Sequence, residues 1–435
     1  MLTAISRAFR TPDLRNKLLF TLGIIVLFRL GSVLPTPGVN TINVQQCLKE
    51  AQSGDAANIY GMVQLFSGGA LLKLSVFALG IMPYITASII LQLLTVVIPR
   101  LEALKKEGQA GTAKITQYTR YLTIGLAVLQ STAFVALART GQLFPNCRQP
   151  LLVSNDAFTI VTMVVVMTAG TSVIMWLGEL ITDRGVGNGM SILIFTQVIA
   201  VFPSELLNIF RQNAFTFVVV MVVGVFMIAA VVFVEQAQRR IPVQYAKRMV
   251  GRRMYGGTST YIPLKVNQAG IIPVIFASSL LYLPQLLVSL FGTSEKPNVV
   301  VEWLAQHFVR GDQPVYMATF FLLIIFFTYF YVSITFNPVE VADNMKKYGG
   351  FIPGIRPGRP TAEYLSYVLS RLTAPGSLYL GLISMVPIIA LAVAGASQNF
   401  PFGGTSILIM VGVGLDTVKQ IESQLQQRNY EGFLK

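Results

Sequence analysis

Long apolar runs recur along the whole chain, and they constrain its fold more than any other feature. An α-helix needs a run of about 18 to 25 mostly apolar residues to cross a bilayer. Ten stretches meet this description, at residues 18–35, 74–97, 118–138, 157–178, 187–207, 215–234, 271–291, 316–336, 374–395 and 404–422. The sequence therefore predicts an all-α integral membrane protein with ten transmembrane helices.

The scarcity of charge supports the same class. Only 12% of the residues are charged and 53% are hydrophobic, whereas soluble domains carry about 25% charged residues. The length of 435 residues would suggest about three domains in a soluble chain. Membrane spans, rather than soluble cores, are expected to organise this one.

The basic residues indicate how the chain is oriented. Lys and Arg concentrate in cytoplasmic loops of membrane proteins. With ten spans, most of the 33 basic residues fall on one side, which holds both termini and the loops 98–117, 179–186, 235–270 and 337–373. We therefore expect both termini to be cytoplasmic, with the net charge of +14 facing lipid headgroups or an acidic partner.

Two cysteines, Cys47 and Cys147, both fall in predicted outer loops. That side of the membrane permits disulfides. A Cys47–Cys147 bridge and a pair of small buried thiols are both compatible with the sequence.

An internal repeat indicates two related halves. "GIMPYITAS" at 80–88 resembles "GIIPVIFAS" at 270–278, and "GMSILI" at 189–194 resembles "GTSILI" at 404–409. The second span thus pairs with the seventh and the fifth with the tenth, so the unit has five spans. Because five is odd, the halves 1–208 and 209–435 must cross the bilayer in opposite senses, which puts the working site at their interface. We expect Pro83 and Pro273 to bend their spans.

Three function classes can be weighed against the residues in the spans. Ion-coupled transporters keep ionisable side chains inside the membrane, but spans two to ten carry such side chains only towards their ends. No catalytic or nucleotide-binding motif is present; "RGVGNGMS" at 184–191 is better explained as a tight turn between closely packed helices. A pore with an apolar constriction remains, since branched side chains can gate by dewetting. A transporter with inverted repeats is the alternative.

Two cytoplasmic loops, 235–270 and 337–373, are longer than a connection requires. The first is strongly basic and has Gly256-Gly257 as the expected hairpin turn between Tyr-, Thr- and Ile-rich arms. The second contains "PGIRPGRP", a turn-rich segment that holds two arginines. These features predict docking surfaces for a cytosolic partner, such as rRNA or an acidic motor protein.

Six motifs together resemble the SecY family, the channel subunits of the bacterial Sec translocon. They are "GIMPYITASIILQLL", "KKEGQAGTAKITQYTRYLT", "GNGMSILIF", "AQRRIPVQYAKR", "IPLKVNQAGIIP" and "PGIRPG". The resemblance runs in order from about residue 13 to 430. It implies a non-enzymatic channel without cofactors, built as an hourglass pore between two inverted five-helix halves. Such a channel passes unfolded secretory chains across the plasma membrane and releases hydrophobic segments sideways into lipid.

The resemblance also implies roles for individual residues. The pore ring would comprise Ile81, Ile85, Met190, Ile194, Ile275 and Ile409. The lateral gate would hold Thr86, Gln130 and Ser279. The motor and the ribosome would contact Arg239, Arg240, Lys247, Arg252, Arg253, Arg356 and Arg359. Methionine is a mild departure at position 190, because the family favours isoleucine in the ring.

A short apolar segment, "NIYGMVQLFSGGALLK" at 58–73, precedes the second span and is too short to be a span itself. By resemblance, residues 57–70 would form a plug helix that seals the outer funnel. Its residues would include Met62, Leu65, Phe66, Ser67, Gly68 and Gly69. The implied partners are the SecE and SecG subunits, the SecA motor ATPase, the ribosome with its rRNA and proteins, signal peptides and nascent chains, membrane lipids, SecDF and YidC.

Overall fold

The computed structural model describes most of the chain. The described residues are 9, 11–51, 69–71, 73–139, 141, 144, 147, 149–212, 214–245, 248–250, 253–255, 259–291, 299–308, 313–394 and 404–432.

Ten helices occupy the ten apolar stretches. They are α2 (Pro12–Val33), α5 (Met82–Val97), α7 (Gln109–Arg139), α8 (Ala157–Arg184), α9 (Gly189–Gln212), α10 (Ala214–Gln236), α11 (Ile272–Phe291), α13 (Pro314–Thr335), α15 (Arg359–Ala394) and α16 (Gly404–Gly432). Among the described residues, five helical stretches are long and apolar enough to cross a membrane. The bent pair of α5 and α6 (Pro99–Lys106) makes a sixth. Shorter apolar helices span Gly189–Pro203 and Ile272–Leu281.

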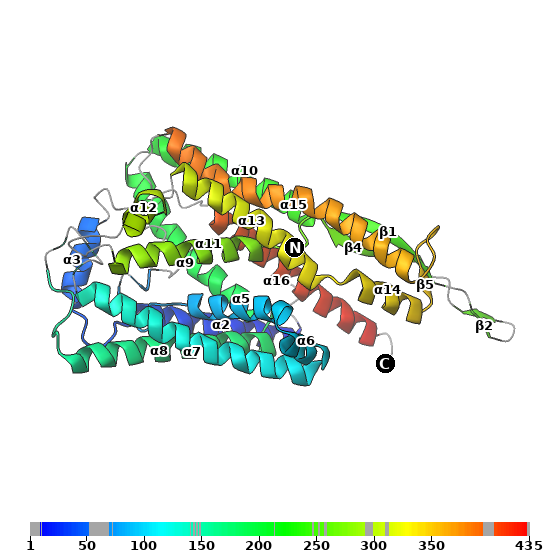
Figure 1. The fold of residues 1–435 in the computed structure, drawn as a ribbon, viewed down its shortest axis with the longest axis horizontal. Helices are drawn as coiled ribbons and strands as arrows, with labels where there is room; N and C mark the ends of the chain where they lie inside the picture. Colours follow the sequence, from blue (N-terminus) through cyan, green and yellow to red (C-terminus); the bar gives the residue numbers. More distant parts are fainter. Residues whose placement is uncertain are drawn as a thin grey trace.

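The helices pack as two groups that meet along a seam. In the first group, α5 packs on α7, α7 on α8, and α8 on both α2 and α9. In the second, α11 packs on α13, α13 on α15, and α16 on both α15 and α10. Across the seam, α9 contacts α10 and α16, while α11 contacts α5 and α7. Figure 1 shows α9, α11 and α16 between the α2–α8 group and the α10–α13–α15 group.

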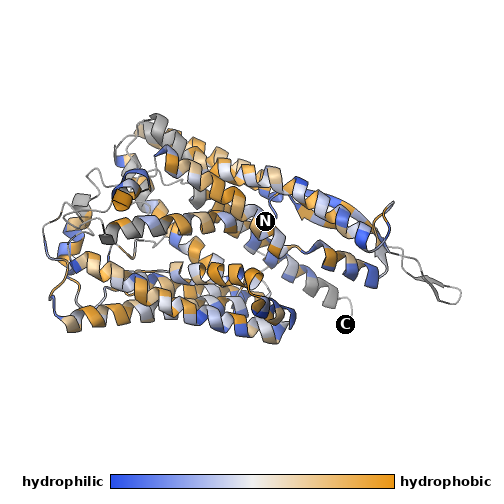
Figure 2. Ribbon diagram, in the orientation of Figure 1, coloured by the Kyte–Doolittle hydropathy of each residue, from blue (hydrophilic) through white to orange (hydrophobic). Residues whose placement is uncertain are grey.

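Apolar side chains cover the outside of this bundle as well as its inside. Figure 2 shows hydrophobic colour along the middle of the long helices and hydrophilic colour towards the two ends of the molecule. Val222 and Phe226 on α10, Leu129 on α7 and Leu322 on α13 are among the large exposed apolar residues. Lipid is as apolar as these side chains, so their exposure is the state expected of a membrane protein.

Proline starts two of the central helices, which corrects the expectation that it bends them. Pro83 lies in the first turn of α5, and Pro273 is the second residue of α11. A proline in the first turn loses no helical hydrogen bond, because that N–H has no intrahelical partner. The second span also begins later than expected, since residues 73–81 form turns and α5 starts at Met82.

The two repeated segments have the same local conformation. Gly80 and Gly270 both have positive φ, of 57° and 62°. In both segments the carbonyl of the residue after the glycine, Ile81 or Ile271, accepts from the N–H groups of the third and fourth residues of the helix that follows. Residues 80–88 and 270–278 therefore resemble each other in backbone conformation as well as in sequence.

The glycines between α8 and α9 serve close helix packing, as expected. A Cβ atom added to Gly189 would overlap the carbonyl of Gly178. The Gly189 N–H also donates to Oγ1 of Thr182 over 2.9 Å. Only glycine permits such a close approach of the two backbones.

The two long loops, 235–270 and 337–373, come together in one small sheet. Strands β1 (Gln238–Tyr245) and β4 (Ser259–Lys265) pair antiparallel, and β5 (Gly350–Phe351) from the second loop pairs with the other edge of β1. Helix α14 (Pro338–Lys347) and the start of α15 cover the sheet through Met345, Leu365 and Val368. In Figure 1 the sheet and α14 lie at one end of the molecule, with α3 (Thr41–Ala51) and α12 (Val299–Phe308) at the other.

A second hairpin corrects the expected position of the turn. Strand β2 (Arg248–Val250) pairs with β3 (Arg253–Tyr255), and Val250 faces Arg253. The chain therefore reverses between Val250 and Arg253 rather than at Gly256-Gly257, which lies outside the described residues.

Candidate functional site

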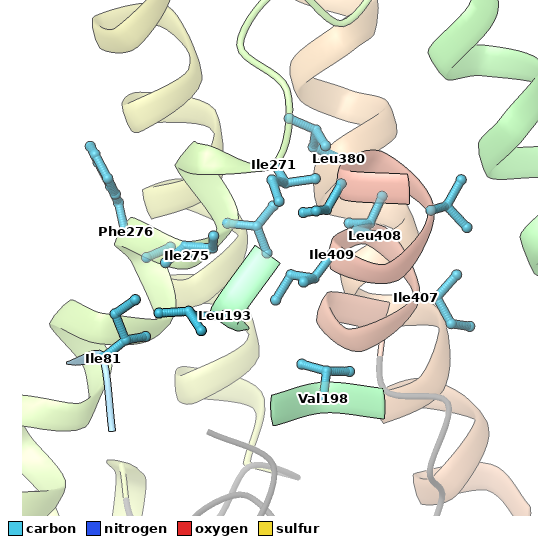
Figure 3. Close-up of a cluster of buried hydrophobic side chains, with 14 of the residues drawn as sticks. Ile81, Leu193, Val198, Ile271, Ile275, Phe276, Leu380, Ile407, Leu408 and Ile409 are labelled. Atoms are coloured by element: carbon cyan, nitrogen blue, oxygen red, sulfur yellow. The ribbon is translucent and has the colours of Figure 1, made fainter. Parts of the chain in front are cut away.

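A buried apolar cluster lies where the two helix groups meet. Ile81, at the N-cap of α5, is 1% exposed; Ile275 of α11 is 7% exposed and Ile409 of α16 is 2% exposed. All three belong to one hydrophobic cluster. Figure 3 shows these side chains converging from three different helices, with Leu193 of α9 among them. Four helices that are distant in sequence thus contribute branched side chains to one region.

The other three predicted ring residues lie against this cluster. Ile85 on α5, and Met190 and Ile194 on α9, are partly buried and pack on it. Met190 is directed partly towards α8, since its sulfur would lie 2.6 Å from a Cβ atom placed on Gly178. The structure therefore gathers all six residues, with Met190 at the α8 side of the group.

Among the many cluster members outside the sequence-based set are Ile271, Leu193 and Leu408. The repeat itself could have revealed them. Ile271 stands where Ile81 stands in the other half, and Leu193 aligns with Leu408 in the second repeated pair. Leu193 and Leu408 are both completely buried. Extending the repeat to every aligned position would have predicted them.

The three predicted gate residues lie on the helices that meet at the seam. Thr86 is on α5, Gln130 on α7 and Ser279 on α11, and α11 packs against both α5 and α7. The Thr86 hydroxyl donates to the Met82 carbonyl of its own helix over 3.0 Å. The Ser279 hydroxyl is buried and has no hydrogen-bond partner in the structure.

Of the predicted plug residues, only Gly69 lies within the described part of the chain. Met62, Leu65, Phe66, Ser67 and Gly68 fall outside it. Gly69 has a φ of +81°, a conformation that glycine adopts without steric cost.

The chain on either side of residues 52–68 is held firmly. Cys47 of α3 forms a disulfide with Cys147, with a Cα–Cα distance of 5.4 Å, which decides between the two alternatives that the sequence left open. On the other side, Ala70, Leu71 and Leu74 are buried. Leu71, Leu74 and both cysteines belong to one hydrophobic cluster.

Exposed arginines flank the small sheet. Arg239 and Arg240 are exposed on β1, and the Arg240 guanidinium lies 4.8 Å from the centre of the Tyr261 ring on β4. Arg356 is exposed in the turn after β5, where its carbonyl accepts from Oγ1 of Thr361 over 2.9 Å. Arg359 is exposed and pairs with Glu363 over 3.1 Å.

The remaining predicted contacts are only partly described. The backbone of Arg253 is in β3, while Lys247 and Arg252 lie outside the described residues. Because β5 pairs with β1, the two loops that carry these arginines belong to one sheet.

Metal chemistry finds no support in the part of the chain that the structure describes. No group of three or more His, Cys, Asp or Glu side chains there could hold a metal ion. The imidazole of His307, on α12, stacks on the Trp303 ring, with 4.8 Å between the ring centroids.

Comparisons with known proteins agree with this arrangement. The SecY family model matches residues 75–418. The protein translocase subunits SecY of Streptomyces galbus and Mycobacterium tuberculosis are 68% and 62% identical to this chain, over the full length of both sequences in each case. The solved structure of a protein-conducting channel matches 94% of this chain and 91% of its own at 19% identity, with a TM-score of 0.62. A structure of Sec61 from a canine ribosome–channel complex matches with a TM-score of 0.59. The chain belongs to the SecY family.

Proposed function

We propose that this chain is the protein-conducting subunit of a translocase, which passes unfolded polypeptides across the membrane and releases apolar segments into the bilayer. The main support for this proposal is the buried apolar cluster that both helix groups form at their seam. A charged side chain at the bilayer centre costs about 2.5–3.5 kcal/mol, so a secretory chain needs a hydrated path. The chain is a channel subunit and not an enzyme.

The apolar cluster is well suited to act as the constriction of that path. Ile81, Ile85, Ile194, Ile275 and Ile409, with Met190 beside them, offer branched and flexible surfaces with no charge to bind a passing chain. Such a ring contacts any sequence weakly, and it hinders ions by dewetting. The aligned residues Ile271, Leu193 and Leu408 would support it from behind.

The seam between α5 and α7 on one side and α11 and α13 on the other is the proposed lateral gate. Thr86, Gln130 and Ser279 lie on three of these helices. A segment that is sufficiently apolar would leave the pore here, because it partitions into lipid more favourably than into water.

Inverted symmetry of the halves 1–208 and 209–435 is part of the same proposal. It is supported by the matched glycine–isoleucine starts of α5 and α11, and by the contact of α9 with α16, the two helices of the second repeated pair.

A crosslinking experiment tests the channel against the alternative, a secondary transporter with inverted repeats. A photoreactive residue is placed at position 81 or 85, and a secretory chain is stalled in transit. We expect a crosslink between the two chains. The same probe at Phe226, an exposed residue of α10, is the control and should crosslink to lipid. Loss of signal at 81 and 85, with the stalled chain present, would reject the proposal.

The exposed arginines on and beside the small sheet, Arg239, Arg240, Arg356 and Arg359, form the proposed docking surface for cytosolic partners, the SecA motor and the ribosome. Its exposed guanidinium groups suit acidic or phosphate-bearing surfaces. SecE and SecG are the proposed partner subunits in the membrane, with SecDF and YidC as further partners.

Arg356→Glu should abolish motor-driven secretion and leave the assembled complex intact, whereas Arg184→Glu, at the end of α8, should leave secretion unchanged. Normal secretion by Arg356→Glu would reject this surface.

The proposed location is the bacterial plasma membrane, with several spans and both termini in the cytoplasm. The support is the disulfide of α3, which lies at the end of the molecule opposite the basic sheet (Figure 1), because disulfides persist outside the cytoplasm. A cysteine introduced at exposed Ile42 of α3 should react with an impermeant maleimide in intact cells. One at exposed Tyr348 should react only after permeabilisation, and the reverse pattern would overturn this orientation.

Residues 57–70 are the proposed plug. The segment begins shortly after Cys47 and ends at Gly69 and Ala70, so both of its flanks are anchored in the same buried cluster. Deleting 60–69 should raise ion leak while sparing membrane insertion. A deletion variant that stays ion-tight would refute the assignment.

A further inference from the structure

A six-residue segment, 266–271, joins strand β4 of the small sheet to α11, and a buried hydrogen bond holds its middle. Asn267 is 2% exposed and Glu235, at the end of α10, is 8% exposed. The Asn267 Nδ2 group donates to Oε1 of Glu235 over 2.6 Å and to the Gly270 carbonyl over 3.1 Å. A hydrogen bond to a buried carboxylate is stronger than one between neutral groups.

Close packing against neighbouring helices holds the same segment from other directions. A Cβ atom on Gly376 of α15 would lie 2.5 Å from the Val266 carbonyl oxygen, and one on Gly412 of α16 would lie 2.7 Å from Cγ2 of Ile271. Ala269 is buried with Val332 of α13 and Leu369 of α15. Four helices of the second group therefore enclose the segment.

Hydrogen bonds and an ion pair fix the end of the segment that adjoins the sheet. The Val266 N–H donates to the Ala237 carbonyl over 3.0 Å, which extends the β1–β4 ladder beyond Lys265. Lys265 itself pairs with Asp416 of α16 over 3.3 Å. On the other side, α11 begins at Ile272. We name residues 265–271 the joint. Each position from the sheet to the helix is either hydrogen-bonded or packed, including Gln268, whose Oε1 accepts from the Lys265 N–H over 3.2 Å.

We propose that the Asn267–Glu235 bond makes the joint a rigid coupler between the docking sheet and α11. When a partner presses on the sheet, α11 would move with it, and α11 carries Ile275 of the apolar cluster and Ser279 of the gate. Asn267 and Glu235 are positioning residues, which act through α11 without touching the translocating chain. This inference rests on the proposed docking function of the sheet.

A rigid coupler and a purely structural contact make different predictions. A structural contact would change stability and partner affinity together. A coupler lets the partner bind normally, while the response of α11 to binding is lost. The experiment must therefore measure the affinity for the partner and the response of α11 separately in each variant.

The experiment uses the full chain, assembled with its membrane subunits in vesicles, with SecA as the added partner. An environment-sensitive fluorophore is attached through Leu280→Cys, an exposed position on α11. The affinity of SecA, the fluorescence change at saturating SecA and the translocation rate at saturating SecA are measured for each variant.

Asn267→Ala should leave the SecA Kd within about twofold and reduce the response and rate by about tenfold, which corresponds to about 1.4 kcal/mol. Glu235→Gln keeps a hydrogen-bond acceptor without the charge, so its response should be intermediate. Gly376→Ala displaces the joint from α15 and should behave like Asn267→Ala. Asn43→Ala, which removes an amide bond to the Pro150 carbonyl at the other end of the molecule, is the matched control and should leave all three quantities unchanged.

The outcomes separate the coupler from the docking proposal. If the parent chain binds no SecA, the docking function fails and the coupler fails with it. If the parent binds and responds, but the joint variants respond equally well, the coupler alone is overturned. A Kd that rises in parallel with the lost response also overturns it, because the bond would then only shape the docking surface.

Discussion

At the scale of single residues, close backbone approach decides several positions. The ring of Phe77 lies between α2 and α8: it stacks on Phe28, with 5.9 Å between centroids, and lies against Gly31 and Gly170. A Cβ atom on Gly31 would overlap this ring. Phe77 precedes Ile81 by four residues, so the two glycines hold the chain that leads into the apolar cluster.

Gly31→Ala should therefore destabilise the protein by about 1–3 kcal/mol, the cost of overpacking a buried site. Gly23 in the same helix has open space around it, so Gly23→Ala should be neutral or stabilising. Thermal unfolding in detergent measures both. Phe77→Leu should rescue part of the loss in Gly31→Ala. Equal effects at Gly23 and Gly31 would contradict the steric explanation.

Ile409→Asn tests the apolar cluster at the same scale. A buried amide without partners costs about 1–3 kcal/mol, which should loosen the closed channel and admit substrates with defective signal sequences. Ile409→Leu keeps volume and polarity, so it should behave like the parent. Secretion of a substrate with a defective signal sequence is the measurement. Unchanged stringency in Ile409→Asn would count against the ring.

At the scale of elements, the ends of the helices were harder to predict than their presence. The apolar run 74–97 continues smoothly through Pro83, so hydrophobicity alone predicts one helix over all of it. The structure starts α5 at Met82, because residues 74–76 bond instead to the end of α2: Leu74 accepts from Thr36 and Val76 donates to Leu34. This interaction is tertiary, and no periodicity reveals it.

The disulfide joins two further elements, α3 and the chain before α8, across a sequence separation of 100 residues. Closing a long loop restricts the unfolded chain, so losing the bridge should cost about 2–4 kcal/mol. Cys47→Ser, Cys147→Ser and the double variant should lose similar stability in thermal unfolding, because each lacks the same bond. Reductant should lower the Tm of the parent but not of the double variant. A double variant that reductant destabilises equally would show that the effect has another cause.

At the scale of the whole molecule, the contacts between the halves matter most. α11 reaches across to α5 and α7, while α9 reaches to α10 and α16. Ser279, whose buried hydroxyl has no hydrogen-bond partner in the structure, lies on α11, one of the helices of the first contact. Opening the first contact while keeping the second would part the halves on one side only, as a hinge does.

Crosslinking across the seam tests this asymmetry. With Thr86→Cys and Ser279→Cys in one chain, a reducible bifunctional reagent should stop the release of hydrophobic segments into the membrane, and reduction should restore it. Each single variant, treated identically, is the control. Insertion assays in vesicles give the readout. Full insertion activity in the crosslinked chain would mean that segments leave by another route.

The sequence by itself determined the membrane class, the ten helical stretches, the family and the repeated segments. These depend on local composition and repeated motifs, which survive in a linear string. The tertiary structure decided the rest: the Cys47–Cys147 bond, the start of α5, the union of two loops by β5, the direction of Met190 and the enclosure of Asn267. Each of these depends on atoms that are far apart in sequence meeting at a few ångströms, and the free energy of such contacts exists only once the helices have packed.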